Sequence, residues 1–385
     1  MSETQVAEPV SDARVVFRPK REFNPELDGV RGMAMVAVFL FHCAPRTGVG
    51  FMNAFFASFW PAIDVFFALS GFLITRNLLD DELNTHRFRN FYVNRALRIV
   101  PAYLLLLLII FGLLPSNQVM AQALQGVPNL WWFLTYAFNF EIAVHDGWPA
   151  NHLMNHFWSL CVEEQFYLLW PPLVYLVHQR WRVHLLAGMF VIAGGAEILL
   201  LMQRVDWAVI HTSVFTRLDS LVIGAVAAFL HRSSKRMSVV PVFTLVFWLC
   251  SAVLVSCGVA TSGLRFTLWH SHPVVHPVLM VWSATLVYLL INGQGHFRKI
   301  ARVFRVRFFV VVGTYSYGIY LFHWIIYMSF VELDAFGWKT ASPWGNFAIV
   351  AISTVVLALL SYNLLEKQCL KLKLRAFEPR VSDRQ

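Results

Sequence analysis

Long apolar segments alternate with short polar segments along most of the chain. A helix that crosses a bilayer needs about 20 predominantly apolar residues. Ten segments satisfy this length once helix ends and helix tilt are allowed for. The pattern therefore predicts an all-α integral membrane protein, a bundle of about ten transmembrane helices. The predicted spans are residues 28–46, 58–78, 97–115, 157–177, 185–202, 214–231, 239–258, 273–292, 308–330 and 343–365.

One further apolar segment is too short to cross a bilayer. Residues 129–140 read NLWWFLTYAFNF. The adjacent Trp131 and Trp132 are typical of the boundary between membrane and water, where amphipathic rings accumulate. We predict an additional interfacial or re-entrant helix at this position.

The basic residues occur in alternate loops. The segments 1–31, 76–98, 178–184, 231–238, 293–307 and 366–385 together contain 26 of the 31 Lys and Arg residues. Positively charged loops stay on the cytoplasmic side of a membrane, so these loops and both termini are predicted to be cytoplasmic. The net charge of +9 then reflects topology and attraction to anionic lipids and anionic cytosolic ligands, and no nucleic-acid partner is expected.

The composition contains no sign of a separate soluble domain. Soluble domains carry about 25% charged residues, whereas this chain has 14% charged and 58% hydrophobic residues. We expect a cytoplasmic N-terminal tail over 1–26, a transmembrane domain over 27–366 and a basic cytoplasmic C-terminal tail over 367–385. No cleavable signal peptide is expected at the start. Cys250 and Cys257 are expected to pack as small hydrophobic residues rather than to form a metal or disulfide site.

Two ionisable residues stand in the first apolar segment. Arg31 and His42 are eleven residues apart, so on a helix they share one face, about 16 Å apart along the axis. Ionisable residues inside a membrane are functional candidates. The alternative is an Arg that reaches the interface from the helix end, and a His whose hydrogen bonds a neighbouring helix satisfies.

The second apolar segment contains a carboxylate and a small-residue pair. Asp64 lies near its outer end, where a buried carboxylate needs a partner such as the imidazole of His42. Ser70 and Gly71 lie farther along the segment and permit a close approach between helices.

Arginines cluster before the third apolar segment. Arg95 and Arg98 are one helical turn apart just before Pro101, with Arg87 and Arg89 close by in the sequence. Retention on the cytoplasmic side and lipid contact explain much of this cluster. The functional alternative is a docking site for a phosphorylated cosubstrate, because Arg binds phosphate oxygens bidentately.

The segment HFWSLCVEEQFYLLWP is the most specific in the chain. Ser159, Glu163 and Tyr167 follow at four-residue intervals and share one helix face. Two adjacent glutamates entering an apolar helix indicate function. The alternative is a structural salt bridge from this segment to Arg217 or Arg98.

Later segments contain three more candidates. Arg217 and Asp219 begin the sixth span, and they are expected to pair with each other or with neighbouring spans rather than to act directly in catalysis. His323 is a second intramembrane imidazole and a candidate for the same cavity as His42. The chain has no GxxxxGK[ST] phosphate loop, no GxGxxG after a strand, no HExxH and no GxSxG motif.

Six segments, in this order, resemble the acyltransferase 3 family of bacterial integral membrane enzymes. They are LDGVRGMAMVAVFLFH, DVFFALSGFLIT, NRALRIVPAY, FWSLCVEEQFYLLWP, RLDSLVIGAV and GTYSYGIYLFHW. The resemblance implies ten membrane helices in the bacterial inner membrane. It implies transfer of an acyl group, usually acetyl, from cytoplasmic acyl-CoA to a hydroxyl of an extracytoplasmic glycan, such as an exopolysaccharide or lipopolysaccharide sugar.

The signatures of that family fall on residues already singled out. Its Arg/Lys-x10-His signature falls on Arg31 and His42, which implies that both are essential. Its WSL-x-x-E-E-x-F-Y signature falls on 158–167, with Cys161 where Ser or Ala is usual. Its Arg-x-x-Arg-Ile-x-Pro segment falls on 95–101. Some relatives carry a C-terminal periplasmic hydrolase-like domain, which is expected to be absent here.

The resemblance and the residues together suggest a division of roles. His42 is suited to be a general base or a transient acyl carrier, oriented by Asp64 or Glu163. The candidate residues are His42, Asp64 and Glu163 for catalysis, Arg31, Arg95 and Arg98 for acyl-CoA, and Ser159, Tyr167, Arg217, Asp219 and His323 for substrate binding or support. No metal is expected. The expected partners are membrane lipids, a glycan or lipid-linked glycan acceptor, and envelope-biosynthesis proteins.

Two other classes of function are compatible with the buried charges. A proton-coupled exporter of a sugar or lipid would use His, Asp and Glu as a relay, although no internal repeat of the kind many transporters show is evident. A noncatalytic scaffold would leave the buried charges without a purpose. The sequence leaves open the acceptor, the acyl group, the oligomeric state and the choice between base and carrier for His42.

Overall fold

The computed structural model describes residues 24–46, 50–260, 272–332 and 339–377, together with Asp334 and Gly337, and these residues form helices without a β-strand. The α-helices are α1 (Pro25–Cys43), α2 (Gly50–Ala57), α3 (Ala62–Asp80), α4 (Arg87–Leu107), α5 (Gln118–Ala123), α6 (Leu130–Leu134), α7 (Phe138–Val144), α8 (Phe157–Leu176), α9 (Arg182–Gln203), α10 (Trp207–Thr212), α11 (Val214–Arg232), α12 (Val240–Ala260), α13 (His272–Asn292), α14 (His296–Phe304), α15 (Arg307–Tyr327), α16 (Pro343–Ser361) and α17 (Lys367–Phe377). Shorter 3₁₀ or π segments are η1 (Leu108–Leu113), η2 (Leu114–Ser116), η3 (His152–Met154), η4 (Gln179–Trp181), η5 (Met328–Glu332) and η6 (Tyr362–Glu366).

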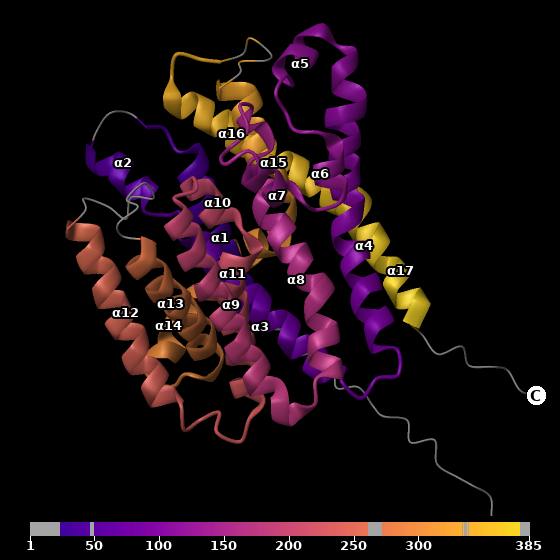
Figure 1. The fold of residues 1–385 in the computed structure, drawn as a ribbon. Helices are drawn as coiled ribbons and strands as arrows, with labels where there is room; N and C mark the ends of the chain where they lie inside the picture. The colour runs from indigo at the N-terminus through magenta and orange to yellow at the C-terminus, as the bar shows by residue number, and fades with distance from the viewer. Residues whose placement is uncertain are drawn as a thin grey trace, which may run out of the picture.

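The long helices run up and down a single bundle (Figure 1). The connections from α3 to α4, from α8 to α9 and from α11 to α12 lie at the lower end of that view, and the short helices α2, α5 and α10 lie at the upper end. These three connections overlap the basic segments 76–98, 178–184 and 231–238. Three of the six basic segments therefore lie together at one end of the fold.

Eight helical stretches of the described residues are long and apolar enough to cross a membrane. They are Met52–Asp80, Arg87–Ser116, Gln179–Gln203, Trp207–Arg232, Val240–Val259, Val275–Asn292, Arg307–Val331 and Pro343–Leu372. The chain is therefore an all-α membrane protein. The first and fourth predicted spans, α1 and α8, are not in this set, and the number of about ten stays a prediction.

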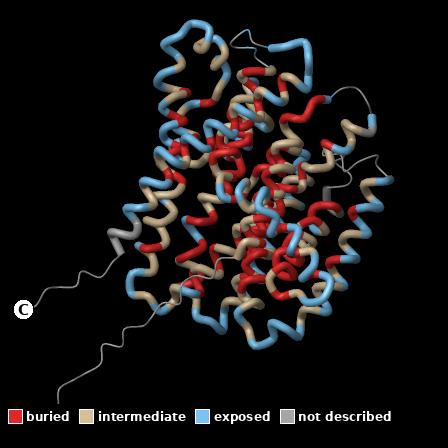
Figure 2. The backbone as a smooth tube through the Cα atoms, turned by 180° about the vertical axis from the view of Figure 1, so that it is seen from behind, coloured by how far each residue is buried: buried red, intermediate tan, exposed pale blue. Residues whose placement is uncertain are grey.

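The apolar helices divide into lipid-facing and interior ones. In the most apolar part of Val240–Val259 only 11% of the residues are buried. The corresponding share in Val275–Asn292 is 67%. Figure 2 shows buried residues gathered along the middle of the bundle and exposed ones at its ends and edges. Exposed apolar surface on outer helices suits contact with lipid chains, and the interior is left for polar chemistry.

Glycines set the closest helix contacts around the interior. A Cβ on Gly32 of α1 would lie 1.9 Å from the carbonyl oxygen of Phe309 on α15. A Cβ on Gly71 of α3 would lie 1.9 Å from the carbonyl oxygen of Leu221 on α11. Any larger residue would push these backbones apart. The predicted close approach at Ser70 and Gly71 is confirmed.

The segment 129–140 forms two short helices instead of one. Tyr136 has φ 51°, a left-handed conformation that ends α6. The N–H of Ala137 donates to the carbonyl of Trp132 over 2.8 Å, which closes the turn before α7 begins. The prediction of a single interfacial or re-entrant helix is therefore corrected, because a tight turn at a non-glycine residue divides it.

The predicted tails fall largely outside the described residues. This holds for 1–23 and 378–385. Residues 367–377 of the predicted C-terminal tail form the helix α17. The domain boundaries and the cytoplasmic position of both termini stay predictions.

Candidate active site

Two cavities, each of about 410 Å³, lie within the bundle. Both are lined by Ile63 and Tyr320, so these two side chains form the partition between them. Arg31 lines the first cavity and His42 lines the second. The two signature residues of α1 therefore both face the interior, but they belong to adjacent chambers rather than to one.

The first cavity, called here the basic cavity, is lined by the four arginines Arg31, Arg76, Arg95 and Arg98. Its acidic lining residues are Asp28 and Glu163. Asp28 accepts a hydrogen bond from Arg31 over 2.8 Å, which leaves an excess of positive charge in the chamber.

Arg95 is held in the basic cavity in an orientation that leaves one donor unused. Its guanidinium carbon lies 3.8 Å from the centroid of the Tyr167 ring, a cation–π contact. Its buried Nε has no hydrogen-bond partner among the described residues. A buried guanidinium donor without a partner is suited to an oxygen atom of an incoming anion.

The predicted shared face of α8 is confirmed. Ser159, Glu163 and Tyr167 all line the basic cavity. The Tyr167 hydroxyl is hydrogen-bonded to the hydroxyl of Ser70, and the Ser159 hydroxyl to that of Tyr320. These bonds join α8 to α3 and to α15, and the second of them reaches the partition residue Tyr320.

In the second cavity, His42 is hydrogen-bonded through Nδ1 to Nε2 of His323 over 2.8 Å. His323 in turn contacts the backbone carbonyl of Tyr320 through Nδ1 over 2.7 Å. A carbonyl only accepts, so Nδ1 of His323 carries the proton and its Nε2 accepts from Nδ1 of His42 in the neutral rings. This order leaves the lone pair of His42 on Nε2.

His323 does not line the cavity with His42, as the sequence suggested, but lies behind it. The side chain of His323 is fully buried, and the lining of the second cavity includes His42 without His323. The position of His323 on α15 is fixed by the glycine contact between α1 and α15. Its place in the fold is that of a supporting residue, which fixes the tautomer of His42.

The predicted contact of Asp64 with His42 is wrong. Asp64 Oδ1 accepts from Nη1 of Arg217 over 3.2 Å and from the hydroxyl of Ser220 over 3.2 Å. The close packing of α3 on α11 turns this carboxylate toward α11 and away from α1. Glu163, the other candidate for orienting His42, lines the basic cavity on the far side of the partition.

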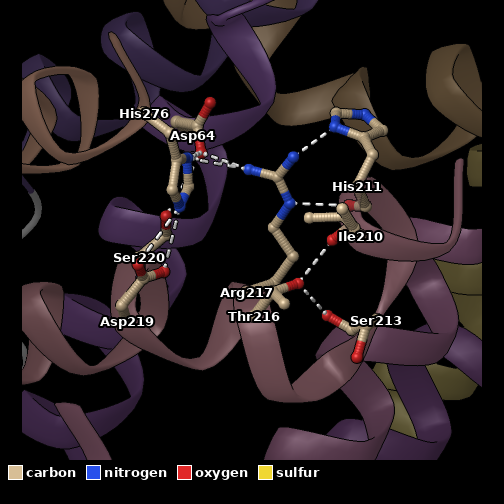
Figure 3. Close-up of polar contacts among 9 residues, drawn as sticks. All are labelled: Asp64, Ile210, His211, Ser213, Thr216, Arg217, Asp219, Ser220 and His276. Carbon is tan, nitrogen blue, oxygen red and sulfur yellow. Dashed lines mark hydrogen bonds and ion pairs between the residues drawn. The ribbon is translucent and has the colours of Figure 1, made fainter. Parts of the chain in front are cut away.

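Arg217 is the centre of a buried network that joins three long helices and α10 (Figure 3). Its side chain is 1% exposed and its Nη1 lies 3.0 Å from Nδ1 of His276 on α13. Nε2 of His276 lies 3.1 Å from Asp219 Oδ2. Pairing of Arg217 and Asp219 with neighbouring spans is thus confirmed. Arg217 binds Asp64, His276 and His211 instead of the α8 glutamates, so the alternative salt bridge from α8 to Arg217 is wrong.

The sequence interpretation missed several residues of the second cavity, called here the histidine cavity. His156 is 3% exposed, and its Nε2 lies 3.3 Å from the Leu321 carbonyl. Other lining residues include His152, His211 and the tryptophans Trp60, Trp148, Trp158, Trp207 and Trp324. The available signal was the count of 14 His and 14 Trp in so apolar a chain. Single residues spread over many segments do not reveal a shared chamber.

Among the residues that the structure describes, no group of three or more His, Cys, Asp or Glu side chains is arranged to hold a metal ion. The arginines of the basic cavity are instead suited to phosphate oxygens.

The family model for the acyltransferase domain of the acyltransferase 3 family matches residues 24–363. The chain belongs to the acyltransferase 3 family. The match covers the described helices from α1 to α16, and thus both cavities. The signature residues of this family lie on either side of the partition, with Arg31, Arg95, Arg98 and Glu163 in the basic cavity and His42 in the histidine cavity.

Relatives of this acyltransferase 3 chain include the peptidoglycan O-acetyltransferase OatA of Listeria monocytogenes, 25% identical over 91% of this chain and 56% of OatA. A Bacillus subtilis protein named provisionally as a peptidoglycan O-acetyltransferase is 26% identical over 93% of this chain and 57% of its own length. A provisionally named Staphylococcus aureus O-acetyltransferase is 26% identical, over 94% and 60% respectively. The chain spans less than two thirds of the length of these relatives. No solved structure matched the chain.

Proposed function

We propose that this chain is a membrane-embedded O-acyltransferase. It moves an acetyl group from acetyl-CoA in the cytoplasm to a hydroxyl of a glycan on the other side of the bacterial inner membrane. The observation that carries the proposal is the pair of cavities that meet at Ile63 and Tyr320, with guanidinium groups in one and the His42 imidazole in the other. A proton-coupled exporter has no comparable support, because the family match is to acyltransferases.

The basic cavity is the proposed donor site. Its lining includes Asn24 near the start of α1 and Arg76 and Asn77 near the end of α3, the end of the fold that contains the basic loops. By the preference of basic loops for the cytoplasm, this cavity faces the compartment that contains acyl-CoA. Both termini then also lie in the cytoplasm.

The residues of the basic cavity fit a phosphorylated cosubstrate. Arg31, Arg76, Arg95 and Arg98 would hold phosphate oxygens, and the unused Nε of Arg95 supplies a donor without a competing partner. Acetyl-CoA supplies an activated thioester. The pantetheine arm extends toward the partition, where Ser159 and Tyr320 lie.

On the histidine side, His42 is proposed as the general base. Its Nε2 takes the proton of the acceptor hydroxyl as the hydroxyl oxygen forms the ester bond and the carbon–sulfur bond breaks. The thiolate of CoA leaves on the donor side and is protonated by solvent. Nδ1 of His42 stays hydrogen-bonded to His323, so the ring keeps its orientation when its charge changes.

The acceptor is proposed to be an envelope glycan. The names of the relatives state peptidoglycan as the acceptor and acetyl as the group transferred. Exopolysaccharide and lipopolysaccharide sugars present the same hydroxyl chemistry. Membrane lipids surround the bundle, and envelope-biosynthesis proteins are the proposed suppliers of the acceptor.

Two measurements test the proposed function. The purified full chain in lipid nanodiscs is given isotope-labelled acetyl-CoA and chitotetraose, a soluble peptidoglycan-type glycan, and mass spectrometry follows labelled acetyl on the sugar. Envelope glycans of a deletion strain are compared with wild type in parallel. Transfer in the nanodiscs and loss of an acetyl group in the strain are expected. No transfer to chitotetraose, together with unchanged envelope glycans, would contradict the proposal.

A further inference from the structure

His211 lies in the wall of the histidine cavity, where Arg217 holds its ring in place. It lies on the short helix α10, is 6% exposed, and lines the same chamber as His42. Arg217 reaches it with two donors: Nε donates to the backbone carbonyl of His211 over 2.6 Å, and Nη2 contacts Nδ1 of its ring. The ring is therefore fixed at both its backbone and its Nδ1.

The contact with Arg217 decides which ring nitrogen carries the proton. A guanidinium has five donors and no acceptor, so Nδ1 of His211 can only accept from it. In the neutral ring the proton is then on Nε2. The histidine cavity thus contains two imidazoles of opposite character, because His42 has its lone pair on Nε2 and His211 has an N–H there.

The network behind Arg217 holds this tautomer in place (Figure 3). Asp64 and His276 flank Nη1 at 3.2 and 3.0 Å, on the side of the guanidinium opposite His211. These residues come from α3 and α13, and the close glycine packing of α3 on α11 fixes their distance. Asp64 and His276 therefore position Arg217, and Arg217 positions His211.

Indole rings surround the His211 imidazole. Ring centroids of Trp158, Trp207 and Trp60 lie 4.7, 5.7 and 6.3 Å from that of His211. Trp148 packs on Trp207 at 5.9 Å and lines the same chamber. Specific pockets combine apolar aromatic walls with a few placed polar groups. A sugar ring suits such a wall, because its C–H face packs on an indole while its oxygens accept hydrogen bonds at the edge.

We infer that His211 is a substrate-recognition residue, whose Nε2–H donates to an oxygen of the acceptor sugar while Nε2 of His42 takes the proton of the hydroxyl to be acylated. The inference rests on the proposed function and goes beyond it by naming how the sugar is oriented. Asp64, Arg217 and His276 are positioning residues in this account. The charged side chains of these three residues act on the substrate only through His211.

A matched pair of substitutions tests the assignment. His211→Gln keeps an amide N–H near the position of Nε2, whereas His211→Asn keeps an acceptor for Arg217 but has no atom near Nε2. The control is His145→Asn, the same change on an exposed side chain outside both cavities. Each protein is purified in nanodiscs, and KM for chitotetraose, KM for acetyl-CoA and the thermal melting temperature are measured.

The expected result is a change in KM for the sugar without a change in KM for acetyl-CoA. His211→Asn raises KM for chitotetraose about tenfold, the order expected for one lost hydrogen bond to a buried donor, and leaves KM for acetyl-CoA unchanged. His211→Gln recovers most of this loss, and His145→Asn behaves as wild type. Equal KM values for chitotetraose in all four proteins would overturn the inference, as would a loss of folded protein in both His211 variants, since the residue would then be structural. An absence of transfer in the wild type would instead refute the proposed function.

Discussion

At the scale of single residues, the carbonyl of Tyr320 sets the neutral tautomer of His42. It accepts from Nδ1 of His323, and His323 consequently accepts from Nδ1 of His42. In a catalytic triad a third group holds the base in the required tautomer, and in this fold a second imidazole and a backbone carbonyl hold the tautomer of His42. The proposed base is thus oriented without a carboxylate.

Replacement of His323 should lower the rate without changing donor binding. His323→Phe removes the acceptor for Nδ1 of His42, and we expect kcat for acetyl transfer to fall about a hundredfold, within the range of general-base contributions. His323→Gln, which retains an acceptor, should lose less. Steady-state kinetics with chitotetraose and acetyl-CoA measure both. Equal rates for the Phe and Gln variants would show that the hydrogen bond to His42 has no role.

Loss of one guanidinium in the basic cavity should weaken acyl-CoA binding. Arg98→Ala removes charge-assisted hydrogen bonds, so Kd for acetyl-CoA should rise about ten- to a hundredfold. The control is Arg180→Ala, an exposed arginine of the α8–α9 connection outside both cavities. Isothermal titration calorimetry in nanodiscs compares the two variants. An unchanged Kd for Arg98→Ala would assign this residue to lipid contact and topology.

Spacing along one helix was predictable at this scale, whereas partners across helices were not. The shared faces of Arg31 with His42, and of Ser159 with Glu163, follow from helical geometry alone. The partner of Asp64 depends on which helix lies opposite, and only the packing of α3 on α11 places Arg217 there. The same limit explains why His211 was missed.

At the scale of elements, the contact between α1 and α15 brings His42 to His323. Gly32 and Gly313 allow it, since a Cβ on either would lie 1.9 Å from a backbone carbonyl oxygen of the other helix. The contact between His42 and His323 therefore depends on glycines, which carry no functional group.

Gly32→Ala should destabilise the bundle and reduce activity together. Separating α1 from α15 forces strain of about 1–3 kcal/mol, so the melting temperature in nanodiscs should fall and kcat should fall with it. Gly188→Ala is the matched control, because a Cβ at this position of α9 has no heavy atom within 4 Å. A Gly32→Ala protein with the melting temperature of the control would contradict the proposed close contact.

The positions of the long helices were predictable because apolar length is a strong signal. The break at Tyr136 was not, since a left-handed residue other than glycine has no sequence marker of comparable strength. The aromatic segment around it reads as one continuous apolar stretch.

At the scale of the whole molecule, two long helices that contain candidate site residues fall short of a membrane-spanning composition. α1 contains Arg31 and α8 contains Glu163, and neither is among the eight stretches apolar enough to cross a membrane by composition. With lengths of 19 and 20 residues, each reaches about 30 Å at 1.5 Å per residue. We propose that both cross the bilayer, shielded by the outer helices.

The proposed orientation makes opposite predictions for the two ends of the fold. Alkaline phosphatase, active only outside the cytoplasm, should be active when fused after Val144 and inactive when fused after Gln179. Green fluorescent protein fused at the C-terminus should fluoresce. Phosphatase activity at Gln179 would invert the orientation and place the basic cavity on the wrong side for acyl-CoA.

The most direct test of the account measures His42→Ala in nanodiscs beside the wild type and His145→Ala. Labelled acetyl transfer to chitotetraose and Kd for acetyl-CoA are determined for each protein. The account predicts that His42→Ala loses transfer by about a thousandfold or more while its Kd for acetyl-CoA and its melting temperature stay those of the wild type. Transfer by His42→Ala at a rate close to that of the wild type would contradict the assignment of His42 as the base between the two cavities.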